Sequence, residues 1–196
     1  MATAKKFLKG FANLNVFTDV QDEVEAYGLL SEDSRYALTG AVSCTVTDNK
    51  TAAAISGDDD PNWYTENVWA TTDLEVTVHE MDLNTLSEML GLGGTGEDDV
   101  LEEGALDETH TFALTFSALK SDMGYRLYRY HSCHLMSYSV SHKTRASSTE
   151  AQDYVLKIQA RPRRIDGKIR ATKDVAKGEA LTWLESIDKL PATPGV

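Results

Sequence analysis

The sequence predicts a mainly β protein that has one or two short helices. Apolar and polar residues alternate with a period of two along most of the chain, which is the pattern of half-buried strands. The composition is that of a globular protein, with 41% hydrophobic and 26% charged residues. A chain of 196 residues can bury one sizeable core, and no break in composition marks a second domain. We therefore expect a single domain over residues 1–196.

The alternation predicts a series of strands along the chain. Residues 68–78 show it most clearly, because Leu74 and Val76 would share one face while Asp73 and Glu75 share the other. The expected strands cover residues 14–20, 36–46, 68–78, 112–117, 125–140 and 153–161.

Helical signals are few. Asp82 is suited to cap a helix over residues 83–90, and Gly91 is suited to end it. The apolar stripe of this helix would consist of Leu83, Leu86 and Leu90. A second short helix is expected over residues 179–187.

Turn and loop signals complete the pattern. The pair Asp166-Gly167 suits the left-handed positions of a tight turn and predicts a hairpin over residues 163–170. Residues 93–108 are rich in glycine and then in acids, which is typical of a solvated loop of undetermined role. Residues 188–196 are expected to form an irregular tail, so the core would extend over about residues 8–187.

The net charge of −12 is unevenly distributed. Residues 1–120 contain 23 Asp and Glu against 6 Lys and Arg, whereas residues 121–196 contain 8 against 13. The acidic excess argues against nucleic-acid binding, which depends on basic contacts to phosphate. Two distant cysteines do not form a disulfide framework, and no apolar run is long enough to cross a membrane. We expect a soluble protein made in a reducing cytoplasm, without a membrane anchor.

The sequence contains no pattern that supports catalysis, a cofactor or a metal. Three consecutive aspartates, at residues 58–60, lack the spacing of a calcium loop. His131 and Cys133 would lie on one face of a strand and His134 on the other, so they cannot converge as zinc ligands. The glycines of residues 91–96 follow a helix, whereas a dinucleotide-binding loop follows a strand. We therefore expect no enzyme and no cofactor.

The order of these features resembles a known family. The strand GAVSCTVTDN precedes the acidic segment AISGDDDPNWYTEN, and VWATTDLEVTVHEMDLNTLSEMLG joins a strand to a leucine helix and glycine. The segments GYRLYRYHSCHLMSYSVSHKT and DYVLKIQARPRRIDGKIRA follow. Over about residues 8–187 this order resembles the major tail protein, or tail tube protein, of long-tailed non-contractile bacteriophages of Gram-positive hosts. The chain departs from the family pattern in its lengthened acidic loop.

The resemblance implies a fold and a function. The fold would be two packed antiparallel sheets, as a β-sandwich or partial barrel, with a flanking helix and a long projecting loop. The protein would be a structural subunit of the virion tail that assembles as stacked hexameric rings and forms the conduit for DNA ejection. Its partners would be its own copies, a tape-measure protein, and tail terminator and distal tail or baseplate proteins. DNA would pass through without specific binding.

The resemblance also suggests three surfaces. A loop between rings would contain Asp58, Asp59, Asp60, Pro61, Asn62, Trp63 and Tyr64. Within it we expect Trp63 to contact the neighbouring ring, while Trp69 could equally belong to the core of its own chain. The candidate lumen acids are Asp73 and Glu75, which could equally lie on the outer surface. The candidate basic seam between subunits consists of Arg161, Arg163, Arg164 and Arg170.

Two functions of other classes remain open. An acidic protein can inhibit a DNA-binding enzyme by imitating phosphates. A monomeric β-sandwich could also bind a ligand such as a sugar, with Trp63 and Trp69 as its platform.

Overall fold

The computed structural model describes residues 7–18, 20, 34–57, 60–93, 100–104, 107–142, 144 and 152–185. The predicted mainly β class is confirmed, because eight antiparallel strands form most of the described chain. The strands are β1 (Leu8–Phe17), β2 (Arg35–Leu38), β3 (Ala41–Gly57), β4 (Asp60–Val78), β5 (Phe112–Lys120), β6 (Tyr125–Val140), β7 (Tyr154–Arg161) and β8 (Arg170–Val175). None of the described helices is long and apolar enough to cross a membrane.

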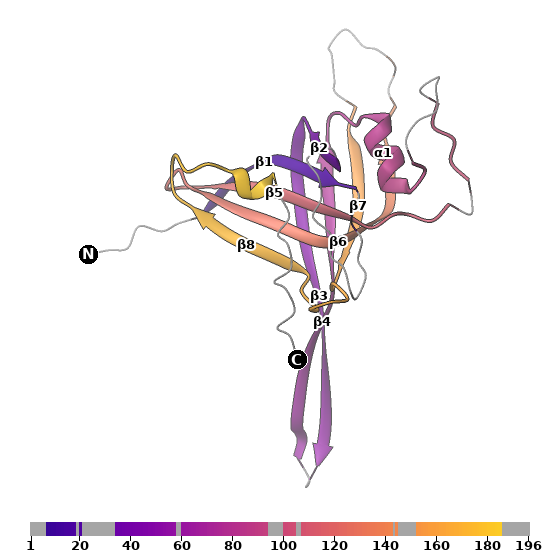
Figure 1. The fold of residues 1–196 in the computed structure, drawn as a ribbon. Helices are drawn as coiled ribbons and strands as arrows, with labels where there is room; N and C mark the ends of the chain where they lie inside the picture. Colours follow the sequence, from indigo (N-terminus) through magenta and orange to yellow (C-terminus); the bar gives the residue numbers. More distant parts are fainter. Residues whose placement is uncertain are drawn as a thin grey trace, which may run out of the picture.

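The strands form one hydrogen-bonded sheet rather than two separate ones. Its order is β2-β1-β5-β6-β7-β4-β3, and β8 also pairs with β6. Figure 1 shows β1, β5, β6 and β8 running across the direction of β3, β4 and β7. The sheet twists so strongly that β3 comes back to contact β1, and a single apolar core fills the space between its two parts. Val16, Val76, Leu114 and Leu156 belong to this core and are fully buried.

One predicted strand is broken in two. Residues 36–46 do not form one strand, because β2 ends at Leu38 and β3 begins at Ala41. Gly40 lies between them with φ of +67°, a left-handed conformation that ends the extended backbone. Its carbonyl accepts a 2.9 Å hydrogen bond from the His79 amide, which holds the break against the end of β4. Strand β2 then pairs with β1, whereas β3 pairs with β4.

The Asp166-Gly167 turn forms, but it does not make a hairpin. Gly167 has φ of +68°, and its amide donates a 2.8 Å hydrogen bond to the Arg163 carbonyl. The strands on either side of the turn both pair with β6: β7 pairs with residues 132–140 and β8 with residues 125–130. Both lie on the edge of β6 opposite β5. Strands β7 and β8 are therefore arranged end to end, and the turn is an excursion between them.

The predicted helix α1 (Leu83–Leu90) is confirmed with both of its caps. The Asp82 carboxylate accepts a 3.2 Å hydrogen bond from the Thr85 amide, and Gly91 ends the helix with φ of +83°. The predicted stripe is partly wrong. Leu86 and Met89 are buried, whereas Leu83 is 43% exposed.

The second predicted helix is a 3-10 turn over Thr182–Leu184 in the described part of residues 179–187. It packs against β5 and β6. The fully buried Arg129 donates a 2.8 Å hydrogen bond from Nε to the Trp183 carbonyl and stacks 3.8 Å from the Trp183 ring centroid. Thr115 donates a 2.9 Å bond to the Leu184 carbonyl. This turn covers the second face of β5, so the strand is buried on both sides. The alternation of apolar and polar residues along β5 therefore does not separate a buried face from an exposed one.

We predict that Gly91→Ala lowers the free energy of unfolding by about 3 kcal/mol. A left-handed alanine costs about 1–2 kcal/mol, and a Cβ here would also overlap the Glu108 carbonyl oxygen, which adds a packing cost of about 1–3 kcal/mol. Urea unfolding followed by circular dichroism measures the change.

The matched control is Gly93→Ala. Gly93 has φ of +71°, but a Cβ there would meet no atom within 4 Å. The control should lose only about 1–2 kcal/mol, the cost of the left-handed backbone. If the two variants lose the same free energy of unfolding, Gly91 does not lie close to the Glu108 carbonyl oxygen.

Candidate assembly interface

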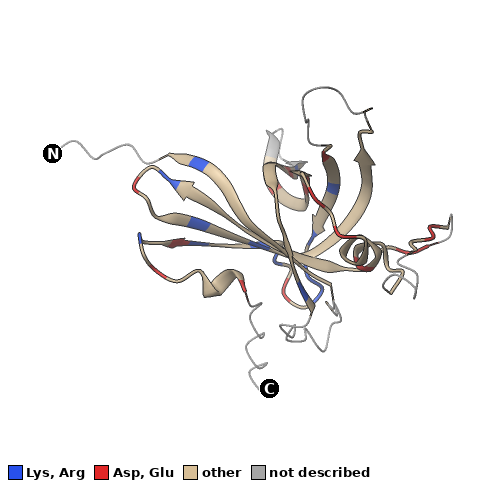
Figure 2. Ribbon diagram, turned by 90° about the horizontal axis from the view of Figure 1, so that it is seen from above, with Lys and Arg blue, Asp and Glu red and all other residues tan. Residues whose placement is uncertain are grey.

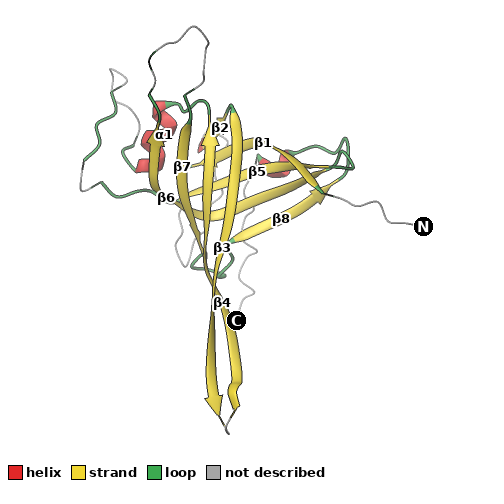
Figure 3. Ribbon diagram, turned by 180° about the vertical axis from the view of Figure 1, so that it is seen from behind, coloured by secondary structure: helices red, strands yellow, loops and turns green. Residues whose placement is uncertain are grey.

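Strands β3 and β4 extend beyond the sheet as a two-stranded arm. Strand β7 pairs with β4 only along residues 72–78, so residues 60–71 pair with β3 alone. We call residues 49–57 and 60–71 the arm, and Figures 1 and 3 show it projecting from the body. Nine residues from Asn49 to Gly57, at about 3.4 Å each, give a length of about 30 Å. The family resemblance implied a projecting loop or hairpin here, and the described backbone is a long hairpin.

Large apolar side chains on the arm are open to solvent. Trp63 is 63% exposed, Tyr64 49% and Val68 49%. Of the remaining residues of the predicted inter-ring loop, Asp60, Pro61 and Asn62 begin strand β4, and Asp58 and Asp59 lie outside the described residues. A two-stranded ribbon has little core of its own, and exposed aromatic groups of this kind mark interaction surfaces.

The root of the arm is fixed to the body by charged and aromatic groups. Arg170 of β8 donates two hydrogen bonds, of 3.0 and 3.1 Å, to the Asp48 carboxylate of β3. Asp48 also accepts a 2.9 Å bond from the Thr72 hydroxyl. The Trp69 ring contacts two cations, with the Lys50 ammonium 5.0 Å and the Arg170 guanidinium 4.7 Å from its centroid. Trp69 is therefore half-buried against its own chain, whereas Trp63 is not.

The candidate lumen acids lie on an exposed polar face of β3, β4 and β7. Asp73 accepts hydrogen bonds from the side-chain amides of Asn49 (2.8 Å) and Gln159 (3.2 Å). Glu75 stands opposite Lys157 in the β4–β7 register. Because a lysine lies beside the acids, this face is polar but only weakly acidic.

The four arginines of the candidate seam do not form one free patch. Arg163 is 6% exposed and donates hydrogen bonds of 2.9 and 2.5 Å to Asp166. Burial raises the pKa of Asp166, but the hydrogen bonds from Arg163 and the Lys168 amide outweigh it and hold this pKa below its usual value. Arg170 pairs with Asp48, as described above. Arg161 and Arg164 are exposed, and Arg161 donates a 3.1 Å bond to Gln159.

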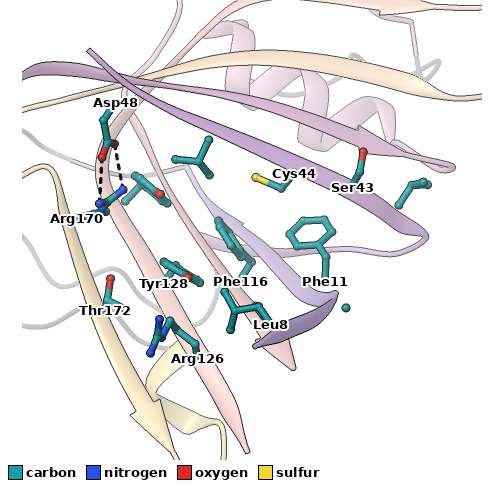
Figure 4. Close-up of a pocket in the computed structure, with 15 residues that line it drawn as sticks. Leu8, Phe11, Ser43, Cys44, Asp48, Phe116, Arg126, Tyr128, Arg170 and Thr172 are labelled. Atoms are coloured by element: carbon teal, nitrogen blue, oxygen red, sulfur yellow. Dashed lines mark hydrogen bonds and ion pairs between the residues drawn. The ribbon is translucent and has the colours of Figure 1, made fainter. Parts of the chain in front are cut away.

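An open groove, which the sequence did not indicate, lies between β3 and the strands that cross it. We call β1, β5, β8 and residues 125–130 of β6 the wing. The cavity between β3 and the wing has a volume of about 780 Å³ (Figure 4). One part of its wall is apolar and aromatic, and the other is polar. Its lining includes Leu8, Phe11, Val42, Cys44, Val46, Asp48, Phe116, Arg126, Tyr128, Tyr130, Arg170 and Thr172.

Burial and ion pairing shift the pKa values of several groups in or beside the groove. Burial raises the pKa of the Cys44 thiol to about 12. Burial also raises the pKa of Tyr130 to about 12, although the nearby Arg170 guanidinium opposes the rise. Hydrogen bonding to Asp174 raises the pKa of Arg126, and the same contact lowers the pKa of Asp174. Near neutral pH, Arg126 and Asp174 thus stay charged, while Cys44 and Tyr130 stay neutral.

The sheet ends in two open edges. Strand β3 pairs only with β4, and β2 pairs only with β1 among the described residues. No other described strand pairs with the outer edge of β3 along its 17 residues, so this edge presents backbone donors and acceptors to a further strand. Within the described ranges, no three His, Cys, Asp or Glu side chains gather as a metal site.

Comparison with known proteins identifies no family. No family model matches the chain, and no curated protein matches it. Among solved structures, a chain of the cryo-EM structure of the anti-feeding prophage baseplate, 6-fold symmetrised, aligns with 91% of this chain and 100% of its own length. Its identity is 10% and its TM-score is 0.42. A likeness at this level does not establish a shared fold or function.

Proposed function

We propose that the protein is a structural, non-enzymatic subunit of the tail tube of a long-tailed bacteriophage. In this proposal, six copies form a ring and the rings stack into the conduit for DNA ejection. The observation that best supports it is the combination of an open-edged antiparallel sheet with a rigidly rooted arm that exposes Trp63 and Tyr64. The arrangement as stacked hexameric rings is taken from the sequence resemblance to tail tube proteins.

The open edge supports ring formation. Unpaired strand edges associate readily with other strands, and a head-to-tail contact whose rotation closes generates a ring. In such a ring, the outer edge of β3 pairs with a strand of the neighbouring copy. Each subunit then has no long unpaired edge, and the sheet continues from copy to copy around the tube.

The arm supports stacking of the rings. Its length of about 30 Å lets it reach beyond the body of its own subunit. Trp63 and Tyr64 lose their water when they contact a second ring, and aromatic groups are where interface energy concentrates. A contact of this kind links rings along the axis, independently of the edge pairing within each ring.

The polar face of β3, β4 and β7 is the proposed lumen surface. Asp73 and Glu75 would face passing DNA without gripping it, since carboxylates repel phosphates. Because Lys157 lies opposite Glu75, the repulsion would be weak. The proposed seam reduces to Arg161 and Arg164, because Arg163 and Arg170 bind acids of their own chain. A tape-measure protein inside the tube, and terminator and baseplate proteins at its ends, are the proposed partners.

A sugar-binding platform is less consistent with the geometry. Trp69 is half-buried between Lys50 and Arg170, so it does not form a flat exposed surface with Trp63. No contact of the described residues favours a phosphate mimic over a tube subunit.

Electron microscopy and mass spectrometry test the proposal. Negative-stain images of the concentrated protein should show rings or tubes. Tails purified from the phage that encodes the protein should contain it as a major component. A tail preparation without this chain would refute the proposal.

We predict that Trp63→Ala abolishes tube formation and leaves the monomer folded. The exposed side chain makes little contribution to the fold but would be an anchor of the ring contact, where truncation costs about 2 kcal/mol or more. The matched control is Leu83→Ala, which removes an exposed apolar side chain from α1. Circular dichroism should be unchanged for both variants, and microscopy should show tubes only for the control. Normal tubes from Trp63→Ala would remove this residue from the interface.

We also predict a measurable coupling between Asp48 and Arg170. In a double-mutant cycle with Asp48→Asn and Arg170→Gln, we expect a coupling of about 1 kcal/mol in the free energy of unfolding, because the pair is bidentate and its side chains are only 23% and 29% exposed.

The Arg126–Asp174 pair is the control. Its side chains are 40% and 46% exposed, and exposed ion pairs contribute about 0.5 kcal/mol or less. If the coupling at Asp48–Arg170 is no larger than that of the control, this ion pair stabilises the root of the arm no more than a solvent-exposed pair would.

A further inference from the structure

Exposed apolar side chains line part of the groove. Leu8 and Val42 are each 45% exposed, and Val46 is 38% exposed. Val42 lies at a bulge of β3, between the pairs Ala41–Val78 and Ser43–Thr77, so the ladder does not cover it. Exposed apolar side chains that gather around one concavity are a typical feature of a binding surface.

The groove has an aromatic wall that suits a further ring. Phe116 packs edge-on against Phe11 with centroids 5.2 Å apart and stacks on Tyr128 with centroids 4.9 Å apart. Figure 4 shows these three side chains lying along the same wall. A volume of about 780 Å³ accommodates two aromatic side chains, and offset or edge-on contacts with them would extend the existing stack.

The arm and the wing have opposite charge. The four elements of the wing contain six basic residues (Lys9, Lys120, Arg126, Arg129, Arg170 and Lys173) and one acidic residue, Asp174. Arg129 is buried, and Arg126 and Arg170 bind Asp174 and Asp48, so Lys9 and Lys173 supply the exposed positive charge of the wing. Figure 2 shows lysine and arginine positions along these strands. Residues 49–71 contain four acids and one lysine. Complementary charge of this kind directs association and fixes its orientation.

The arm does not fill the groove of its own chain. The arm extends away from the body in both Figures 1 and 3, so its end does not reach the groove of its own chain. A second copy can present the same arm from outside. We infer that the groove between β3 and the wing binds Trp63 and Tyr64 from the arm of another copy of this chain. This inference rests on the proposed tube, for which it identifies the surface that receives the arm.

Photocrosslinking tests the inference directly. The variant Trp63→p-benzoylphenylalanine keeps an aromatic side chain at the end of the arm and bonds on irradiation to whatever lies beside it. Mass spectrometry of the assembled protein should locate the bond on groove residues such as Leu8, Phe11 or Val42. Tubes in which the bond maps to another surface would overturn the inference and leave the tube proposal intact.

Blocking the groove gives a second, independent test. Val42→Lys places a charge among its apolar walls and should reduce the yield of tubes at least ~10-fold, as expected for the loss of a central contact. The matched control is Leu83→Lys, because Leu83 of α1 is about as exposed as Val42. This control should assemble normally. Unchanged assembly of Val42→Lys would overturn the inference. If the unaltered protein forms no tubes and the Trp63→p-benzoylphenylalanine variant forms no crosslinked pairs, the tube proposal and this inference both fail.

Discussion

Hydrogen bonding along β6 determines where the other long strands lie. One edge of β6 is occupied by β5, and the opposite edge is shared by β7 and β8, which lie end to end. Strand β7 continues the sheet through β4 to β3, whereas β8 pairs with β6 and with no further described strand. The sheet therefore divides along β6 into two parts that cross, and the apolar core fills the space between them. The groove lies between the same two parts, and the arm is the portion of β3 and β4 that extends past β7.

Features that depend on neighbouring residues were predictable from the sequence. The two faces of residues 73–76 in β4, the bounds of β6 and both caps of α1 follow from local spacing, and the structure agrees with them. The predicted apolar face does not extend to Val68 and Ala70, which are exposed in the arm. Features that depend on distant strands were not. The Asp166-Gly167 turn has its expected local geometry, but nothing within residues 163–170 shows that both flanking strands pair with β6. The burial of both faces of β5 likewise depends on the turn over Thr182–Leu184, which is far away in the sequence.

The candidate site shows the same division. Arg163 and Asp166 are three residues apart, whereas Arg170 finds Asp48 across 122 positions, so the basic run at residues 161–170 gave no sign that two of its members are neutralised internally. Trp63 and Trp69 are equivalent as sequence signals. They differ because Trp69 lies at the root of the arm, where Arg170 reaches it from β8, whereas Trp63 lies beyond the reach of the body. The groove combines residues of β1, β3, β5, β6 and β8, which no local pattern relates.

Charge also explains how exposed aromatic groups and an open strand edge can coexist in one chain. Residues 49–71 contain four acids and one lysine, so like charge opposes the pairing of one arm with another. The basic wing offers an arm the opposite field, and the apolar groove beside it offers Trp63 and Tyr64 a place to lose water. Repulsion between arms and attraction to the wing act on the same acids. In the proposed assembly, the uneven distribution of charge along the chain thus favours arm-to-groove contact over aggregation through the arms.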